Sequence, residues 1–278
     1  LNESYIANKC AKQNNIKHII KNFNKEELRQ LVQRFYTNMD SPTNDGLNNY
    51  IVSSYAKRMG TKVIISGIGG DEFFKGYPTF KRIQKINYIP KTKFIGDIVY
   101  HLLKPILNFL DLNQKYAGIL KYGGTLAEAY FLQRSFMFQD DLNDLLSPET
   151  IRIGLKDLNL FEEINEDLKD FEDINLAIMY LEIKYYLTSK LLKDADWTSM
   201  SNSIELRTPL VDWFFFKQII PLLKSNLNIT KSNLFESYEN NLPKELINRK
   251  KTGFVVPHRE LFKLITNKKR EGLLPEIS

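Results

Sequence analysis

The chain has 278 residues, 43% of them apolar, which is enough for one large domain or two smaller ones and excludes a wholly disordered protein. Its net charge of +6 is mild, and its basic residues are scattered among acidic ones, so we expect no nucleic-acid partner. No run approaches the ~18 apolar residues of a membrane-spanning helix, because charges such as Lys104 and Lys184 interrupt the apolar stretches, so we expect no membrane partner either.

The single cysteine, Cys10, excludes an internal disulfide and a metal site built from clustered thiols. This favours a reducing, cytoplasmic setting. Cys10 lies in a helical pattern and is interpreted as a core thiol. The chain opens at Leu1 without the layout of a signal peptide, and we expect that a segment upstream is missing.

In chain order, the apolar spacing of the first part predicts a helix at 3–13, a strand at 17–23 (KHIIKNF), helices at 26–39 and 45–59, and a strand at 62–66 (KVIIS). Gly60 is a plausible stop for the third helix. This order is typical of parallel crossover units, so the first part is predicted to be α/β. We expect the two strands to be parallel neighbours, with the turn after the second at their carboxyl ends.

Beyond about residue 88 the pattern predicts helices at 94–110, 126–138, 174–187 and 189–203, and no strand. The predicted organisation is a partial α/β core at 1–88 followed by a mainly helical part at 89–278. Two strands are too few for a stable parallel sheet. We therefore expect the sheet to be incomplete at its N-terminal side.

The most informative segment is SGIGGDEFFKGY at 66–77, directly after the second predicted strand. Gly67, Gly69 and Gly70 allow a tight turn whose backbone amides can approach a phosphate. Asp71 and Glu72 follow at the start of the next helix, where carboxylates can hold Mg²⁺ that bridges phosphate oxygens. The alternative is a plain strand-to-helix turn capped by Asp71, and the segment alone does not decide between the two.

Two further segments carry groups suited to a binding site. LLKDADWTSMSNSIELRTPLVD at 191–212 contains Asp196 on a predicted helix, then Glu205 and Arg207 two apart. In an extended stretch Glu205 and Arg207 point the same way and can pair, most simply as a structural salt bridge. NRKKTGFVVP at 248–257 places Lys251 before a Gly-Phe loop, and by itself such a lysine is typical of a solvated surface.

Together, these segments resemble the asparagine synthetase family. That family carries SGxGGDExFxGY after a strand, then D-x-x-SM-x-x-S-x-E-x-R-x-P-x-x-D, then K-x-GF-x-x-P, and all three patterns occur here in that order. The stretch MDSPTNDGLNNYIVSSYAKRMGTKV also resembles the family's D-x-P segment that leads into the strand. The resemblance covers roughly residues 1 to 265.

The resemblance implies an adenine nucleotide α-hydrolase-like α/β fold that uses ATP and Mg²⁺. It implies that a carboxylate, such as the side chain of aspartate, is adenylated with release of pyrophosphate, and that ammonia then displaces AMP. In these terms Ser66 and Gly67 contact the nucleotide, Asp71 binds the metal on the pyrophosphate, and Lys251 stabilises charge that develops on the phosphate. Asp71 and Lys251 are therefore expected to open onto one cleft.

The sequence departs from the family pattern in two ways. Characterised family members have glutamate after the first Ser-Gly, whereas this chain has Ile68, which cannot transfer a proton. Members with an apolar residue there resemble enzymes linked to cell-surface polysaccharide genes, so the acceptor carboxylate is left open. The family's SGG-x-DS loop and its glutaminase domain, which supplies ammonia from glutamine, are expected upstream of Leu1. The chain alone is therefore predicted not to release pyrophosphate.

Two other functions stay open from the sequence. A tRNA-modifying ATP pyrophosphatase would share the fold, but such proteins usually bring zinc cysteines or a basic RNA surface. An inactive remnant that binds a nucleotide or a partner domain is the third hypothesis. An SGG-x-DS segment in the upstream reading frame would favour the enzyme over both.

Overall fold

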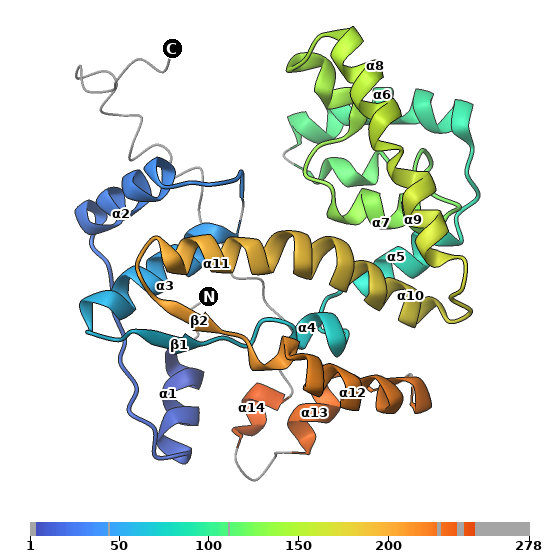
Figure 1. Cartoon of the computed structure of the whole chain (residues 1–278). Helices are drawn as coiled ribbons and strands as arrows, with labels where there is room; N and C mark the ends of the chain where they lie inside the picture. Colours follow the sequence, from blue (N-terminus) through green and yellow to red (C-terminus); the bar gives the residue numbers. More distant parts are fainter. Residues whose placement is uncertain (1–3, 44, 111, 227–228, 238–241, 248–278) are drawn as a thin grey trace, which may run out of the picture. The chain divides into compact units, whose positions relative to one another are not determined.

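The computed structural model describes residues 4–43, 45–110, 112–226, 229–237 and 242–247 (Figure 1). The chain forms two compact units, one made of Leu1–Gly76 with Leu187–Ser278 and one made of Tyr77–Tyr186. The chain therefore leaves the first unit after residue 76 and returns to it at residue 187. The sequence predicts a change of character at residue 88, from a partial α/β core to a mainly helical part, and this division stays a prediction.

The first unit contains both strands and is otherwise helical. Its elements are α1 (Ser4–Gln13), α2 (Lys25–Thr37), α3 (Gly46–Arg58), β1 (Val63–Ile65), α4 (Gly70–Phe73), α11 (Lys193–Met200), β2 (Glu205–Arg207), η4 (Pro209–Val211), α12 (Trp213–Ser225), α13 (Lys231–Glu236) and α14 (Lys244–Ile247). The π-helical segment η3 (Glu182–Leu192) contains the boundary with the second unit.

The regular elements in the described part of the second unit are all helices. Its elements are α5 (Thr79–Asn87), α6 (Lys93–Phe109), η1 (Gln114–Tyr116), α7 (Leu126–Arg134), η2 (Gln139–Asp144), α8 (Pro148–Leu158), α9 (Leu160–Leu168) and α10 (Ile174–Leu181). Most of the helices predicted from apolar spacing are therefore present, with ends that shift by a few residues.

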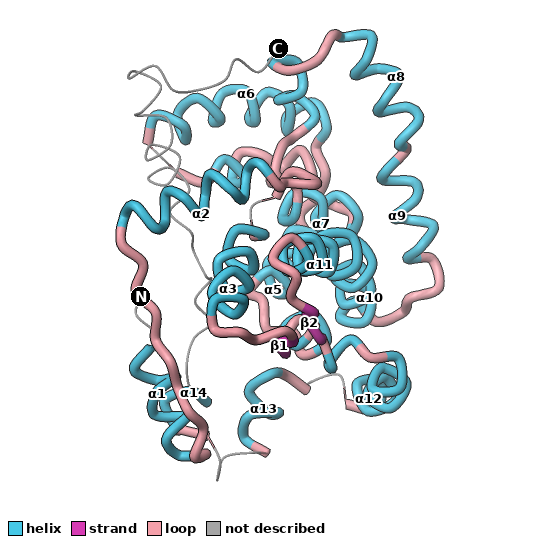
Figure 2. Tube along the Cα trace, turned by 60° about the vertical axis from the view of Figure 1, so that its left-hand side comes forward, coloured by secondary structure: helices cyan, strands magenta, loops and turns pink. Residues whose placement is uncertain are grey.

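The strands β1 and β2 pair in parallel, with Ile64 opposite Leu206. Both of these side chains are half-buried, whereas Val63 and Ile65 beside them in β1 are exposed. The strand pair therefore has one covered face and one open face. In both views the helices α3 and α11 lie side by side next to the strands (Figures 1 and 2). The helix–strand layering expected of an α/β fold is thus present around a small parallel pair.

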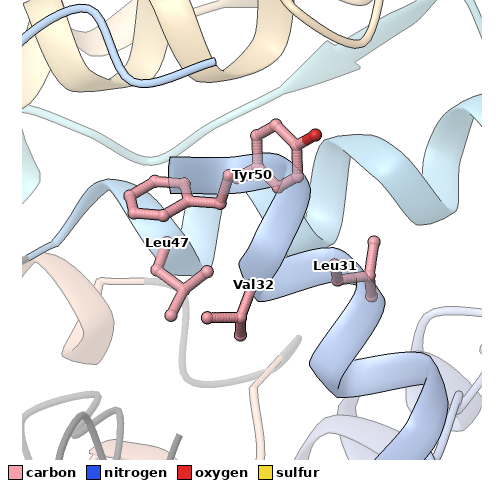
Figure 3. Close-up of a cluster of buried hydrophobic side chains, with 5 residues drawn as sticks. Leu31, Val32, Leu47 and Tyr50 are labelled. Atoms are coloured by element: carbon pink, nitrogen blue, oxygen red, sulfur yellow. The ribbon is translucent and has the colours of Figure 1, made fainter. Parts of the chain in front are cut away.

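The core of the first unit lies between α2 and α3. Leu31, Val32 and Phe35 of α2 pack on Leu47 and Tyr50 of α3, and each of the five is at most 3% exposed (Figure 3). Trp197 of α11 packs on the same cluster, its ring centroid 5.4 Å from that of Phe35. A capping box between Asn24 and Glu27 begins α2, which explains why the helix starts where the sequence predicts. The cluster joins the two N-terminal helices to α11.

The predicted strand at 17–23 is wrong. This stretch has no regular secondary structure, and β1 pairs with β2 instead. Ile16, Ile19 and Ile20 are each more than 40% exposed, so the apolar run that suggested a strand is not buried. A strand needs a neighbour for its backbone groups, and none lies beside this stretch among the described residues. The expectation of no strand after residue 88 is also wrong, because β2 lies there.

A buried arginine organises the second unit. The guanidinium of Arg134 lies 4.7 Å from the ring centre of Tyr77 and 3.7 Å from that of Tyr186. Its Nε donates a 3.0 Å hydrogen bond to Glu182, whose side chain is fully buried. Burial opposes the charge of Arg134, but the attraction of Glu182 outweighs it and raises the pKa of the guanidinium. Burial and the same carboxylate raise the pKa of Tyr130, which stays a neutral phenol.

Helix α6 carries an apolar stripe that the described chain does not cover. Phe94, Ile98, Leu102, Ile106 and Phe109 recur at helical spacing and are each at least 46% exposed. The opposite side of the helix is anchored by Tyr100, which is fully buried. The sequence pattern thus predicts the helix correctly, although its apolar face is not the buried one.

We predict that Arg134→Met destabilises the second unit by about 3–5 kcal/mol, because the buried carboxylate of Glu182 loses its partner. The matched control is Arg152→Met on α8, where the arginine is exposed and the change should stay within about 0.5 kcal/mol. Amide hydrogen exchange in α7 and α10 measures this free energy for the second unit separately. Equal protection in the two variants would contradict the prediction.

Candidate functional site

The glycine-rich turn follows β1 directly. Its first residue, Ser66, extends the strand pairing, since its backbone N–H donates a 2.8 Å hydrogen bond to the carbonyl of Arg207. The hydroxyl of Ser66 accepts a 3.3 Å hydrogen bond from the N–H of Ile68. Gly69 has a φ of 99°, which strongly favours glycine. The turn therefore lies at the carboxyl end of the strand pair, as predicted from the sequence.

The residues after β2 pack against this turn. A Cβ on Gly69 would lie 2.6 Å from Val211, and one on Gly70 would lie 3.2 Å from Leu210. By contrast, nothing lies within 4 Å of a Cβ placed on Gly67, which is exposed. The stretch 208–211 (TPLV) therefore packs against Gly69 and Gly70, whereas Gly67 faces open space. Two of the three motifs that the sequence singled out are thus in contact.

Asp71 at the start of α4 is paired with a lysine that the sequence analysis missed. The Nζ of Lys231 donates a 2.8 Å hydrogen bond to Oδ1 of Asp71, whose side chain is 18% exposed. The backbone N–H of Lys231 donates to the carbonyl of Phe74, also at 2.8 Å. The start of α13 is therefore held against α4 by two bonds. Nothing in the local sequence around Lys231 indicates this contact, which joins residues far apart in the chain.

Gly76, near the end of the SGIGGDEFFKGY motif, is required by the same carboxylate. A Cβ on Gly76 would lie 1.9 Å from Oδ1 of Asp71 and 3.0 Å from its Cα. The N–H of Gly76 also donates a 2.9 Å hydrogen bond to the carbonyl of Asp71. The last glycine of the motif thus leaves room for the Asp71 side chain to take the position in which Lys231 reaches it.

A second carboxylate, Asp194 of α11, connects α11 to the segment before α3. It is 1% exposed and accepts hydrogen bonds from the hydroxyl of Thr43 and the indole N–H of Trp197. The hydroxyl of Thr43 also accepts a 3.0 Å hydrogen bond from the backbone N–H of Gly46. The Nζ of Lys190 lies 3.6 Å from Oδ2 of Asp194. The family-like DSP segment is therefore tied to α11 by a satisfied, buried polar network.

The other predicted site residues have different surroundings. Glu72 is buried, with 1% of its surface exposed. Asp196 is exposed on α11. Arg207 donates a 2.8 Å hydrogen bond to Glu205, which confirms the predicted pairing, and both side chains are exposed. Lys251 and the rest of the third motif lie outside the described residues, so the convergence of Asp71 and Lys251 stays a prediction.

The donor set around the turn bears on the predicted Mg²⁺. Among the described residues there is no group of three or more His, Cys, Asp or Glu side chains that could hold a metal ion. Mg²⁺ at phosphate sites is usually bound by one or two carboxylates together with phosphate oxygens and waters. The single partly exposed carboxylate of Asp71 fits that mode.

In the described chain no helix is both long and apolar enough to cross a membrane.

A parallel strand pair that ends in a glycine-rich turn, with an acidic residue just beyond it, is typical of α/β domains that bind nucleotide phosphates. The family model for asparagine synthase matches residues 1–274, and the chain belongs to this family. No solved structure matches the chain at a significant level.

Two relatives extend this comparison. The chain is 26% identical over 277 residues to asparagine synthetase (glutamine-hydrolysing) 1 of Bacillus subtilis, which covers 98% of this chain and 43% of that protein. It is 24% identical over 253 residues to a Mycobacterium tuberculosis protein provisionally named asparagine synthetase (glutamine-hydrolysing), which covers 87% of this chain and 37% of that protein. The chain therefore spans less than half the length of these relatives.

We predict that Gly76→Ala destabilises the first unit by about 1–3 kcal/mol, because the new methyl group displaces the Asp71 carboxylate from Lys231. The matched control is Gly67→Ala, where the methyl group enters open space and the change should stay within about 0.5 kcal/mol. Urea denaturation followed by the fluorescence of Trp197, in a Trp213→Phe background, reports on this unit. A Gly76→Ala variant as stable as the Gly67→Ala variant would show that a methyl group at position 76 does not displace the Asp71 side chain.

Proposed function

We propose that the chain is the synthetase part of an enzyme that activates a carboxylate with ATP and transfers ammonia to it. The observation that carries this proposal is the assembly at the carboxyl ends of β1 and β2. There the glycine-rich turn, the Asp71–Lys231 pair and the stretch after β2 come together from three distant parts of the chain. Membership of the asparagine synthase family supports the same reaction class.

The turn is proposed to hold the nucleotide. Ser66 and Gly67 begin it, and Gly67 is the glycine with open space around it, so its backbone can approach a phosphate closely. Gly69 and Gly70 shape the turn through a positive φ and through contact with the residues after β2. Glycine at these positions is what an anion-binding turn of backbone amides requires.

Asp71 and Lys231 are proposed to serve the pyrophosphate side of ATP. Mg²⁺ bound with the nucleotide would neutralise phosphate charge, and Asp71 is the residue that would hold it. Lys231 lies within hydrogen-bonding distance of that carboxylate and provides a positive charge next to the turn. Lys251 is proposed as a second phosphate-stabilising lysine on the basis of its motif. Glu72 as a second metal ligand, and supporting roles for Asp196, Glu205 and Arg207, stay predictions.

The proposed reaction has two steps. An oxygen of the acceptor carboxylate attacks the α-phosphorus, the bond to the leaving oxygen breaks, and pyrophosphate departs to leave an acyl-adenylate. Ammonia then attacks the acyl carbon, the bond to AMP breaks, and an amide forms with loss of one proton. Positive charge preorganised around the phosphates stabilises both transition states more than the ground state. Ile68 cannot accept the proton, so it must pass to another group or to water.

The substrates and partners are part of the proposal. We propose aspartate or a related carboxylate as acceptor, and ammonia released from glutamine by a glutaminase domain in the longer protein. A cytoplasmic setting is where ATP and these substrates are available. The names of the two relatives, each a glutamine-hydrolysing asparagine synthetase, support this assignment.

The proposal predicts the behaviour of the protein extended upstream in its natural reading frame. Asp71→Asn, Lys231→Met and Lys251→Ala should each lower pyrophosphate release from ATP, in the presence of acceptor and ammonia, on the order of a hundredfold. Lys224→Met, at an exposed position on α12, is the matched control and should leave the rate unchanged. Pyrophosphate is measured by a coupled assay, with circular dichroism to confirm folding. Folded Asp71 and Lys231 variants with normal rates would exclude this site.

A further inference from the structure

The second unit contains a cavity that the proposed function does not use. Its volume is about 240 Å³, and it lies among α5, η1, the loop before η1 and α7. It is lined by Arg82, Lys85, Ile86, Ile89, Asn113, Lys115, Tyr116, Ile119 and Gln133. Pockets for drug-sized ligands are usually about 300–1,000 Å³, so this cavity suits a smaller molecule.

Three of the lining residues are cations. Arg82 and Lys85 lie three residues apart on α5, so they share one side of the helix, and Lys115 comes from η1. None of the lining residues is acidic. Within the described chain, Arg82 and Lys85 have no ion-pair partner. Most other lysines near this part of the unit are paired, as Lys91 is with Glu128 and Lys121 with Asp140. The cavity therefore has a surplus of positive charge.

This surplus of positive charge affects the pKa of Lys115. Its ammonium is partly buried and donates to the backbone carbonyl of Gln133. Burial, and then the nearby charges of Arg134 and Arg82, lower the pKa of Lys115 to about 8. Arg134 is itself paired with Glu182, and Lys104 of α6, the helix that packs on η1, is paired with Asp141. An anion that enters the cavity would relieve the repulsion that Lys115 experiences.

The other lining residues are three isoleucines together with Asn113, Tyr116 and Gln133. Ile86 is buried, Ile89 and Ile119 are half-buried, and the three contribute apolar surface to the cavity. A ligand that fits has an anionic head for the cations and a short apolar body for the isoleucines. With three positive charges, a head with two negative charges is matched better than a head with one.

We infer that the cavity between α5, η1 and α7 binds a small phosphate monoester with an apolar body. This site is separate from the proposed ATP-dependent reaction, whose residues lie in the first unit. Its failure would therefore leave the proposed function untouched, and the reverse also holds.

The test is a ³¹P NMR titration of the 278-residue chain with hexyl phosphate at pH 7.5. We expect saturable binding that weakens on the order of tenfold in Arg82→Gln and in Lys85→Gln, since each removes a charged partner of the head group. Both positions are exposed, so the variants should fold normally. The matched control is Lys81→Gln, an exposed lysine on α5 that does not line the cavity, and it should bind as the unchanged chain does.

Ligand variation tests the chemistry of the head and the body. Hexanoate should bind more weakly than hexyl phosphate, inorganic phosphate should bind more weakly still, and hexanol should not bind. Hexanoate or inorganic phosphate that bound as tightly as hexyl phosphate would overturn the inference. Binding of the chain to phosphatidic acid vesicles without any binding of hexyl phosphate would also overturn it and would indicate a lipid surface instead.

The role of Lys115 has its own readout. Hexyl phosphate is a dianion at both pH 7.5 and pH 9, so a change in affinity between them reports on the protein. Above pH about 8 the free Lys115 is mostly neutral, and binding must then take up a proton, so affinity should fall as the pH rises. Lys115→Met should abolish this fall. Affinity that does not change between the two pH values would contradict the assignment of Lys115 to the site.

Discussion

The contacts of Arg134 with the rings of Tyr77 and Tyr186 hold the two ends of the second unit together. These tyrosines are the first and last residues of the second unit, and their ring centroids lie 6.0 Å apart. In the sequence, the second unit is an insertion between the two segments of the first unit. The buried carboxylate of Glu182 holds the guanidinium in place, and losing one partner of such a pair costs far more than an exposed contact does. The two ends of the insertion are therefore held close together, which closes the loop that the insertion forms.

The pairing of β1 with β2 benefits from this closure. These strands are separated in sequence by the entire second unit, and bringing distant segments together costs entropy that grows with the length of the flexible loop. A folded insertion whose ends are already adjacent removes most of that cost. Once β1 and β2 are paired, Ser66 bonds to Arg207 and the turn rests on Leu210 and Val211. The geometry of the candidate site thus depends on the pairing of two strands that are far apart in the sequence.

How much the sequence could predict depended on the range of the interaction. The helices, the strand at β1 and the turn with its glycines follow from local spacing and local backbone needs, and they are present. The strand at 17–23 was predicted from an apolar run alone, and that run is exposed. Burial is decided by neighbours, which local pattern does not specify. The exposed stripe of α6 makes the same point, since periodicity identifies an apolar face without showing what covers it.

The missed residues are long-range partners. Lys231 belongs to none of the segments singled out from the sequence, and only the fold brings its ammonium to Asp71. Gly76 and Asp194 are visible in the motifs, but their roles depend on a carboxylate that needs space and on Thr43 from another segment. Such roles arise from contacts between motifs. The sequence identified the motifs, and their pairing required the fold.

The Asp71–Lys231 pair also has a consequence for the proposed reaction. A partly buried carboxylate is costly without a compensating charge. In the protein without ligand, Lys231 provides a compensating charge for Asp71. In the proposed reaction Asp71 would hold Mg²⁺ that comes with the nucleotide, the metal would supply positive charge there, and Lys231 would provide a further positive charge beside the turn. One lysine would then balance charge in both states. On this proposal the carboxylate of Asp71 would have a positively charged partner both before and after the nucleotide binds, so neither state would leave a partly buried ion unpaired.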